Sequence, residues 1–371
     1  MRIAVIATSY PANAEDPSGH FVQAEARATA AQGHAVTLFV PRERGRPVEP
    51  GLSLVPLPHL GLFGWPGAVA RLREMPQAIL GIVPFVLRAQ AELRAKGPFD
   101  AMVAHWLIPS FWPIACGHSI ERSRRIGSIS RKNAVKTTVV AHGSDVRLLE
   151  RLPETLKRRI LVALAQPHVS VRCVSGELAS KLRSLSAECG LSLERVEVSP
   201  CAIEVPTFPE KAEMRHKLGI STEPLVLVVC RVVQTKQVDC AIESCFVALG
   251  VYPTVIGDGP QLAELSRKYP QARWLGRLPR NLTLQWLRAA DCLVSASEIE
   301  GAPTVVREAR ALGTPVVAVN AGDLTLWATE DAGLTVVPAV SAQTTGTLST
   351  SIARKQLVAA LAREICATVR C

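Results

Sequence analysis

The sequence predicts an α/β protein with parallel sheets in two domains, and two stretches together with the chain length carry this prediction. Residues 291–320 read as a short apolar strand, a polar turn, a helix and a second apolar strand. Residues 2–40 show a strand, a polar loop, an alanine-rich helix and another strand. Strand-helix-strand order is typical of parallel sheets that helices cover on both faces. A chain of 371 residues exceeds what one hydrophobic core usually supports, so two domains are expected.

Proline and glycine mark the ends of the helix within residues 291–320. Pro303 suits the first helical position, because its fixed φ fits the helix and its missing N–H would have no partner there. Gly313 supplies a left-handed cap, and Pro315 stops the helix before the next strand. The pattern therefore predicts a helix over 303–312 whose N-terminus lies at the carboxyl edge of the sheet.

Two carboxylates flank that N-terminus, since Glu300 lies in the turn and Glu308 about one and a half turns inside the helix. The unpaired N–H groups of a helix N-terminus favour a phosphate. Carboxylates instead accept hydrogen bonds from hydroxyls, so the pair suits a ligand that carries a diphosphate between two hydroxyl-rich groups, as a nucleotide sugar does. A solvated turn residue and an exposed helix residue explain such a pair equally well when it stands alone.

Hydropathy indicates a globular chain with no membrane span. The hydrophobic share of 48% is that of an ordinary folded protein. The most apolar long segment, residues 78–86, is interrupted by Gly81 and Pro84 and is too short to cross a bilayer. Residues 3–7 read as a first strand and not as a secretory signal, so a cytoplasmic location is expected.

Cysteine spacing and net charge limit which cofactors and partners are expected. The ten cysteines form no CxxC pair, and neither clustered His/Cys ligands nor an Asp-x-Asp motif is visible, so a reducing compartment and no metal are expected. The net charge of +10 favours an anionic partner. Basic stretches interleaved with aromatic residues are absent, so this partner is not expected to be a nucleic acid.

An apolar loop and a basic helix together suggest contact with a membrane surface. The loop, residues 51–67, contains Leu60, Leu62, Phe63 and Trp65, and a helix with several arginines is predicted over 68–96. Apolar tips beside basic residues suit an anionic lipid interface. The alternative is that these apolar side chains pack under the first domain.

The segment EGAPTVVRE, residues 300–308, resembles the motif of two glutamates with seven residues between them in retaining glycosyltransferases of family 4, which have the GT-B fold. Further segments resemble this family in the same order along the chain: SGHFVQAEARATAAQGHAVTLFV after the first strand, HWLIPSFWPIA, HGSD, CRVVQTKQVD and GDGP. The resemblance implies two Rossmann-like, doubly wound domains that face each other across a cleft. An acceptor-binding domain is expected over 1–205 and a nucleotide-sugar-binding domain over 206–371, with the last helix a candidate to cross back to the first domain.

The resemblance also implies a role for each site residue. The catalytic set is Glu300 for the orientation of the transferred sugar, His142 near the same sugar, and Arg231 and Lys236 for the leaving diphosphate. Two cations suit that task, because negative charge develops on the phosphate as the bond to the sugar breaks. The donor-binding set is Glu308 at the ribose hydroxyls together with Gly19, Gly257, Asp258, Arg277, Leu278, Gly301, Ala302, Pro303 and Thr304.

The activity that the resemblance implies is a metal-independent transfer of a sugar from a nucleotide-sugar donor to a saccharide or lipid-linked acceptor. The anomeric configuration would be retained, and the product would belong to the cell envelope or an exopolysaccharide. Such an enzyme is expected at the inner face of the cell membrane as a peripheral protein. A catalytically silent protein that binds nucleotide sugar and a sugar-nucleotide epimerase of the same fold remain alternatives. A nicotinamide dehydrogenase does not fit, since no GxGxxG follows the first strand.

Overall fold

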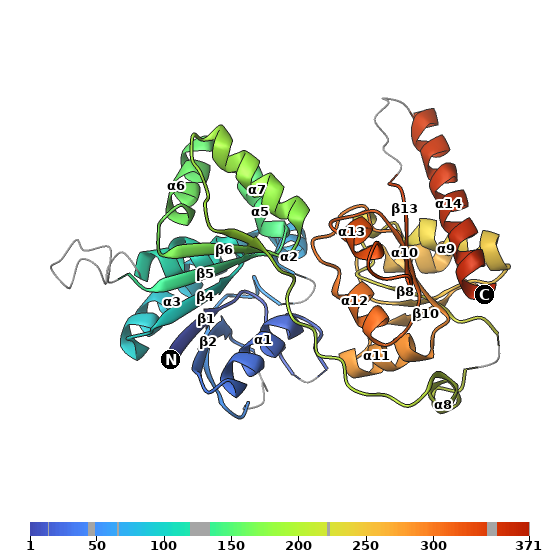
Figure 1. The fold of residues 1–371 in the computed structure, drawn as a ribbon, viewed down its shortest axis with the longest axis horizontal. Coiled ribbons are helices and arrows are strands. Elements are labelled where there is room, and N and C mark those ends of the chain that lie inside the picture. Colours follow the sequence, from blue (N-terminus) through green and yellow to red (C-terminus); the bar gives the residue numbers. More distant parts are fainter. Residues whose placement is uncertain are drawn as a thin grey trace. The chain divides into compact units, whose positions relative to one another are not determined.

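The computed structural model in Figure 1 describes residues 1–13, 15–43, 49–64, 67–118, 134–220, 223–339 and 347–370. The chain forms two compact units, Met1–Ala202 and Ile203–Cys371. Each unit contains one parallel sheet with helices packed on it, so the predicted α/β class is confirmed. The sequence analysis placed the boundary after residue 205, close to the observed division after Ala202.

The first unit holds a seven-stranded sheet in the order β3-β2-β1-β4-β5-β6-β7, and every neighbouring pair is parallel. The order reverses between β1 and β4, which is the switch point where doubly wound sheets bind ligands. The strands are β1 (Arg2–Ile6), β2 (Ala35–Pro41), β3 (Leu52–Leu57), β4 (Ala101–His105), β5 (Lys136–Ala141), β6 (Val169–Cys173) and β7 (Val196–Val198).

The helical elements of the first unit connect these strands. They are α1 (His20–Ala31), α2 (Ala68–Glu74), η1 (Pro76–Gly81), α3 (Ile82–Lys96), η2 (Leu107–Ala115), α5 (Ser144–Glu150), α6 (Glu154–Leu164) and α7 (Gly176–Glu188). The single helix predicted over 68–96 was wrong, because α2, η1 and α3 divide this stretch. Met75 has φ −134° and ψ 80°, since the ring of the following proline excludes the helical conformation at that position.

The loop before α2 packs against the first unit, so the predicted membrane contact of Leu62 and Phe63 was wrong. These side chains are only 2% and 4% exposed. Phe63 packs edge to face on Phe85 of α3, with ring centroids 4.7 Å apart. Leu62 and Phe63 therefore extend the core of the unit, as the alternative interpretation held, whereas Leu60 of the same loop is 69% exposed. Trp65 lies outside the described residues.

The second unit holds a six-stranded parallel sheet in the order β10-β9-β8-β11-β12-β13. Its order reverses between β8 and β11, as it does between β1 and β4 in the first unit. The strands are β8 (Val226–Val229), β9 (Thr254–Ile256), β10 (Arg273–Gly276), β11 (Cys292–Ser295), β12 (Val316–Val319) and β13 (Leu334–Val337).

Helices cover both faces of this second sheet. They are α8 (Lys211–Lys217), η4 (Gln234–Lys236), α9 (Val238–Leu249), α10 (Leu262–Lys268), α11 (Arg280–Ala289), α12 (Thr304–Ala311), α13 (Leu324–Ala328) and α14 (Thr347–Arg370). Val226 and Val228 belong to one core cluster and Leu227 to the other. Burial on both faces explains why β8 is a continuous apolar run.

Two details of the second unit differ from expectation. Pro303 is the N-cap of α12, with φ −64° and ψ 109°, and helical geometry begins at Thr304. The last helix, α14, was a candidate for a return to the first domain. Its buried residues Leu361 and Ile365 instead join the core cluster that contains α9, and Figure 1 shows α9 and α14 side by side.

No helix in the described part of the chain combines the length and apolar character that a membrane span requires.

A close backbone approach requires glycine in the GDGP turn after β9. A Cβ on Gly257 would lie 1.8 Å from the carbonyl oxygen of Cys230, and one on Gly259 would lie 2.4 Å from that of Val232. The turn is also tied to this segment by hydrogen bonds, since the Val232 N–H donates to the Asp258 carbonyl over 2.9 Å. The glycines therefore let β9 and β8 end side by side.

We predict that Gly257→Ala lowers the free energy of unfolding by at least about 3 kcal/mol, because the added methyl group collides with fixed backbone. Gly250→Ala is the matched control, since Gly250 also has positive φ (71°) but nothing lies within 4 Å of its added Cβ. The control should lower the free energy of unfolding by only about 1 kcal/mol. Urea unfolding of both variants measures the difference, and equal losses would contradict the steric argument.

Candidate active site

The carboxyl edge of the second sheet brings several predicted site residues together. β8 and β11 pair in parallel at the switch point, so both strands end at the same edge. Arg231 and Lys236 follow β8, and the turn with Glu300 follows β11. Two cations and a carboxylate thus occupy the place where this class of sheet binds its ligands.

Lys236 and Glu300 form an ion pair at this edge. The Lys236 ammonium donates to Oε1 of Glu300, and both side chains are largely buried, with 15% and 14% of their surface exposed. The two loops also contact each other through the backbone, because the Glu298 N–H donates to the Thr235 carbonyl over 3.0 Å. A cation for phosphate and an acceptor for hydroxyls therefore lie next to each other.

Glu308 is buried in α12 and is held by Arg280 of α11. Its side chain is 7% exposed, and its Oε1 accepts from Nε and Nη2 of Arg280 at 3.0 and 2.7 Å. Arg280 also donates to the Glu204 carbonyl over 2.5 Å. The interpretation of Glu308 as an exposed helix residue was thus wrong. Sequence reasoning missed Arg280, which no spacing connects to position 308.

The remaining donor-binding candidates of the second unit lie around the same strand ends. Asp258 accepts from the Gly259 N–H over 2.7 Å. Arg277 is exposed after β10, whereas Leu278 packs on the core. Gly301 and Ala302 form the turn before Pro303 and Thr304, the N-cap and first residue of α12.

Gly19 and His142 belong to the first unit, where each follows a strand of the sheet. Gly19 precedes α1 with φ 67°, and a Cβ there would lie 2.5 Å from the Ser9 carbonyl oxygen, so the turn requires glycine. His142 comes directly after β5, as predicted. Its ring lies between aromatic side chains, with centroids 4.4 Å from Trp106 and 5.1 Å from Phe21.

His142 contacts a second histidine that sequence reasoning missed. Its Nε2 lies 3.2 Å from Nδ1 of His105, the last residue of β4. Burial, followed by the positive charge of Arg172, lowers the pKa of His105 to about 3. Burial likewise holds the pKa of His142 well below its usual range, and the neighbouring His105 adds to the effect. Both imidazoles are therefore neutral at neutral pH, and each offers one lone pair and one N–H.

Asp145 organises the backbone around His142. Its buried carboxylate accepts the N–H groups of Leu107 at 2.9 Å, His142 at 3.1 Å, Gly143 at 2.9 Å and Val146 at 3.0 Å. Burial raises the pKa of Asp145, against the opposing effect of these donors. The carboxylate of the HGSD segment thus positions His142 and joins β5 to the segment after β4.

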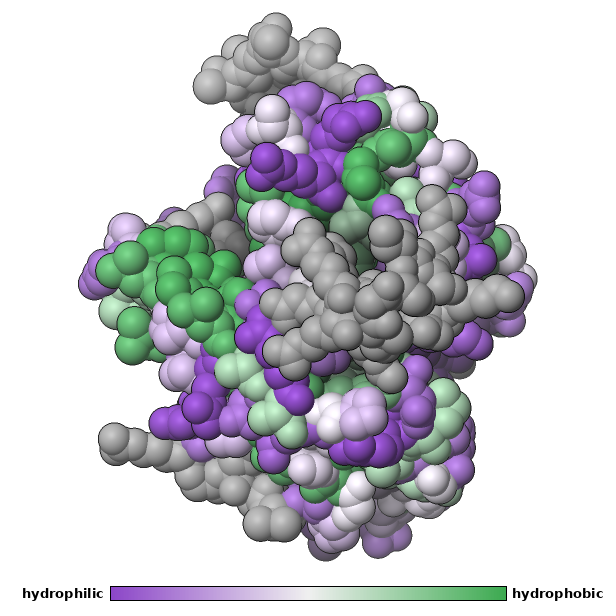
Figure 2. Space-filling view, turned by 90° about the vertical axis from the view of Figure 1, so that its left-hand side faces the viewer, coloured by the Kyte–Doolittle hydropathy of each residue, from purple (hydrophilic) through white to green (hydrophobic). Residues whose placement is uncertain are grey.

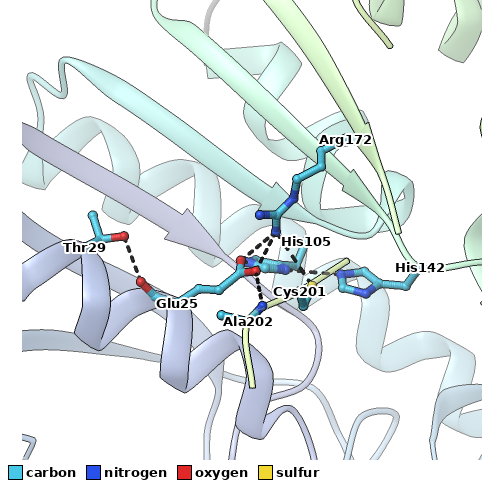
Figure 3. A network of polar contacts seen from close by, with 7 residues as sticks. All are labelled: Glu25, Thr29, His105, His142, Arg172, Cys201 and Ala202. Atoms are coloured by element: carbon cyan, nitrogen blue, oxygen red, sulfur yellow. Dashed lines mark hydrogen bonds and ion pairs between the residues drawn. The ribbon is translucent and has the colours of Figure 1, made fainter. Parts of the chain in front are cut away.

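Glu25 of α1 is the centre of a polar network in the first unit, drawn in Figure 3. It accepts from Nη2 of Arg172 at 2.8 and 2.6 Å and from the Ala202 N–H at 3.1 Å. Its Oε2 also lies 3.7 Å from Nε2 of His105. The network therefore links α1, β4, β6 and the last residues of the first unit.

One group of potential metal ligands occurs among the residues that the structure describes. His105, His142 and Cys201 each place a ligand atom within 4.8 Å of the other two. These three residues form no cluster in the sequence, because they lie far apart in the chain and the parallel strand order brings them together.

Comparisons with known proteins found a matching family, curated relatives and solved structures. Residues 223–351 match the family described as Glycosyl transferases group 1. A D-inositol 3-phosphate glycosyltransferase of Xylanimonas cellulosilytica is 24% identical over 91% of this chain and 84% of its own length. TuaC of Bacillus subtilis, named as a glycosyltransferase for teichuronic acid biosynthesis, is 28% identical over 60% of this chain and 54% of its own length.

The similarity to solved structures extends over both units of this chain. Sucrose-phosphate synthase of Thermosynechococcus elongatus gives a TM-score of 0.68 at 18% identity and covers 100% of this chain and 94% of its own. HepE of Anabaena in complex with UDP-glucose gives a TM-score of 0.59 at 16% identity. This match covers 100% of this chain and 94% of the HepE chain. The fold is that of the GT-B glycosyltransferases. The group 1 glycosyltransferase match covers residues 223–351, the larger part of the second unit.

We predict that Asp145→Asn lowers the free energy of unfolding by about 1–3 kcal/mol, because the new amide NH₂ faces backbone N–H donors that need an acceptor. Asp100→Asn is the matched control, since Asp100 is exposed and its carboxylate accepts from the Arg2 N–H at 2.7 Å. Chemical denaturation should show a clearly smaller loss for the control. A stability of Asp145→Asn equal to that of the wild type would contradict the organising role.

Proposed function

We propose that this protein transfers a sugar from a nucleotide-sugar donor to a saccharide or lipid-linked acceptor, with retention of the anomeric configuration, as a member of family 4. The observation that carries the proposal is the pairing of Lys236 with Glu300 at the switch point of the second sheet. A phosphate and a sugar hydroxyl on one ligand would satisfy both partners of this pair. HepE of Anabaena supports the donor class, since its structure was solved with UDP-glucose.

The second unit would bind the donor through two acidic residues with different tasks. Glu308 would accept hydrogen bonds from the ribose hydroxyls, and Arg280 would keep its carboxylate in place. Glu300 would orient the transferred sugar. The glycine turn after β9 and the residues around Pro303 would surround the diphosphate through backbone N–H groups.

Arg231 and Lys236 would stabilise the departing diphosphate. As the bond between the anomeric carbon and the phosphate oxygen breaks, negative charge grows on that oxygen, and nearby cations lower the energy of the transition state. Hydrogen bonds from sugar hydroxyls to Glu300 strengthen as positive charge develops on the ring. We assign His142 to contact with the same sugar. Because two side-chain cations serve the leaving group, we propose that the transfer needs no divalent metal.

The donor site is tested by a pair of variants with opposite expected effects. Glu300→Gln should lower turnover about 100-fold or more with little change in donor affinity, because its hydrogen bonds strengthen in the transition state. Glu308→Gln should weaken donor affinity roughly tenfold or more, because it removes a charged acceptor from the ground-state complex. Calorimetric titration with a panel of nucleotide sugars and an assay of nucleoside diphosphate release measure both quantities.

Glu213→Gln, an exposed residue of α8, is the control and should change neither quantity. NMR of the product with its acceptor reports the anomeric configuration, and inversion would exclude retention. Loss of donor binding in Glu300→Gln with unchanged binding in Glu308→Gln would contradict the roles assigned to the two glutamates. Donor affinity without any release of diphosphate would indicate a binding protein instead of an enzyme.

We propose that the acceptor is presented at a membrane surface, with the protein peripheral at the inner face of the cell membrane in envelope or exopolysaccharide synthesis. TuaC supports the polysaccharide assignment through its name. The first unit carries an exposed apolar surface around η1 and the start of α3, and Figure 2 shows a hydrophobic patch on the face that it draws. This surface consists of Leu60, Met75, Ile79, Leu80, Val83 and Leu87, which are 40–69% exposed.

We propose this apolar surface as the membrane contact in place of Leu62 and Phe63, which are buried. Val83 and Leu87 lie four residues apart on one side of α3, and Leu80 lies in η1 three residues before Val83. The loop after β3 reaches the same place, since a Cβ on Gly81 would lie 1.9 Å from the His59 carbonyl oxygen. The net charge of +10 would add attraction to anionic headgroups.

We predict that the protein co-sediments with vesicles that contain phosphatidylglycerol at low salt, and that the double variant Leu80→Ser/Leu87→Ser reduces the bound fraction at least about tenfold. Each leucine contributes roughly 1.5–3 kcal/mol when it is buried in the apolar layer. Val247→Ser, which changes a 63% exposed residue of the second unit, is the control. Equal sedimentation of the double variant and the wild type would remove this surface from the proposal.

A further inference from the structure

The His105, His142 and Cys201 side chains converge at the carboxyl edge of the first sheet. His105 ends β4, His142 follows β5, and these strands pair in parallel. Cys201 comes from the segment after β7. Figure 3 shows the sulfur of Cys201 beside the two imidazole rings. The three ligand atoms lie within 4.8 Å of one another.

We propose that His105, His142 and Cys201 form a binding site for a zinc ion, with a solvent molecule as the fourth ligand. Two nitrogens bound to tetrahedral zinc are about 3.3 Å apart, and a nitrogen and a sulfur about 3.6 Å. Nδ1 of His105 and Nε2 of His142 are already 3.2 Å apart. A shift of the Cys201 side chain by roughly 1 Å would bring its sulfur within the distances of a zinc site.

The donor set selects zinc over the cations that are abundant in cells. Two imidazole nitrogens and a thiolate suit zinc, whereas magnesium and calcium prefer oxygen ligands. His105 and Cys201 are 1% and 4% exposed. Burial keeps competing water away from these two ligands, whereas His142 is partly exposed.

Charged groups around the three ligands match those of zinc sites. Oε2 of Glu25 lies 3.7 Å from Nε2 of His105, the nitrogen that points away from the site. A carboxylate in this place orients a metal-binding histidine and makes it a better ligand. Nη2 of Arg172 lies 3.7 Å from the Cys201 sulfur. A guanidinium at this distance favours the thiolate, which is the form that binds metal.

Zinc in this site would connect the end of the first unit to its sheet. Cys201 precedes the last residue of that unit, Ala202. Coordination would add a strong link to the contacts that Glu25 and Arg172 already make with this segment. The site shares His142 with the proposed function, in which this residue contacts the transferred sugar, but it includes none of the diphosphate-binding residues of the second unit. Metal binding is measured without a donor, so its outcome is independent of the transfer reaction.

The test must report on the sulfur, because a hydrogen bond between two neutral imidazoles also explains the separation of 3.2 Å. The full-length protein is freed of metal with a chelator under reducing conditions and then titrated with Co²⁺ and with Zn²⁺. We expect one Co²⁺ per chain, with a thiolate-to-cobalt charge-transfer band and the strong d–d bands of four-coordinate cobalt. Cys201→Ala should lose the charge-transfer band.

The zinc affinities of variants distinguish the metal ligands from the residues around them. Glu25→Gln should weaken zinc binding roughly 10- to 100-fold, and Cys201→Ala should weaken it more. Cys189→Ala is the matched control, because Cys189 is a partly exposed free cysteine at the end of α7 in the same unit, and it should bind zinc like the wild type. Equal affinities of Cys201→Ala and Cys189→Ala would overturn the proposal.

X-ray absorption of the zinc-loaded wild type keeps the test independent of how the variants fold. One sulfur at about 2.3 Å and two imidazole nitrogens at about 2.0–2.1 Å are expected. A zinc shell without sulfur, or the absence of stoichiometric zinc binding, would overturn the proposal. Circular dichroism of each metal-free variant shows whether the loss of a ligand has changed the fold instead of the site.

Discussion

Parallel strand pairing is the constraint on which both candidate sites depend. In the second unit, the pairing of β8 with β11 makes the loops that carry Lys236 and Glu300 begin at one edge. In the first unit, the pairing of β4 with β5 does the same for His105 and His142. Antiparallel pairing would send successive loops to opposite edges. Residues far apart in the chain therefore meet because every neighbouring strand runs in the same direction.

Charges at these edges occur in pairs between different elements. Lys236 pairs with Glu300, Arg280 with Glu308, and Arg172 with Glu25. A partly buried charge that loses its partner lowers stability, because no opposite charge then compensates for its lost hydration. A ligand that draws a cation away must therefore offer hydrogen-bond donors to the carboxylate. A diphosphate next to sugar hydroxyls offers both groups at once, which is why the ion pairs and the proposed donor fit each other.

Local patterns predicted the second unit well and the first unit less well. Strands 254–256 and 316–319 have the predicted bounds, because each is an apolar run with polar or turn-forming residues on both sides. The helix over 68–96 was predicted whole, although Pro76 divides it. Leu62 and Phe63 were predicted at the surface, yet Phe63 packs on Phe85. Amino-acid composition alone cannot show whether an apolar loop packs on its own domain or on another surface.

The sequence by itself determined the α/β class, the bounds of strands 254–256 and 316–319, and the positions of Glu300, Lys236 and His142 beside strand ends. These features depend on neighbours within a few residues, and apolar runs, prolines and glycines record them directly. Only the tertiary structure decided that Arg280 holds Glu308 and that His105, His142 and Cys201 converge. Such contacts depend on strand order and side-chain direction across the sheet, and no local pattern in a single sequence encodes a distance between residues so far apart in the chain.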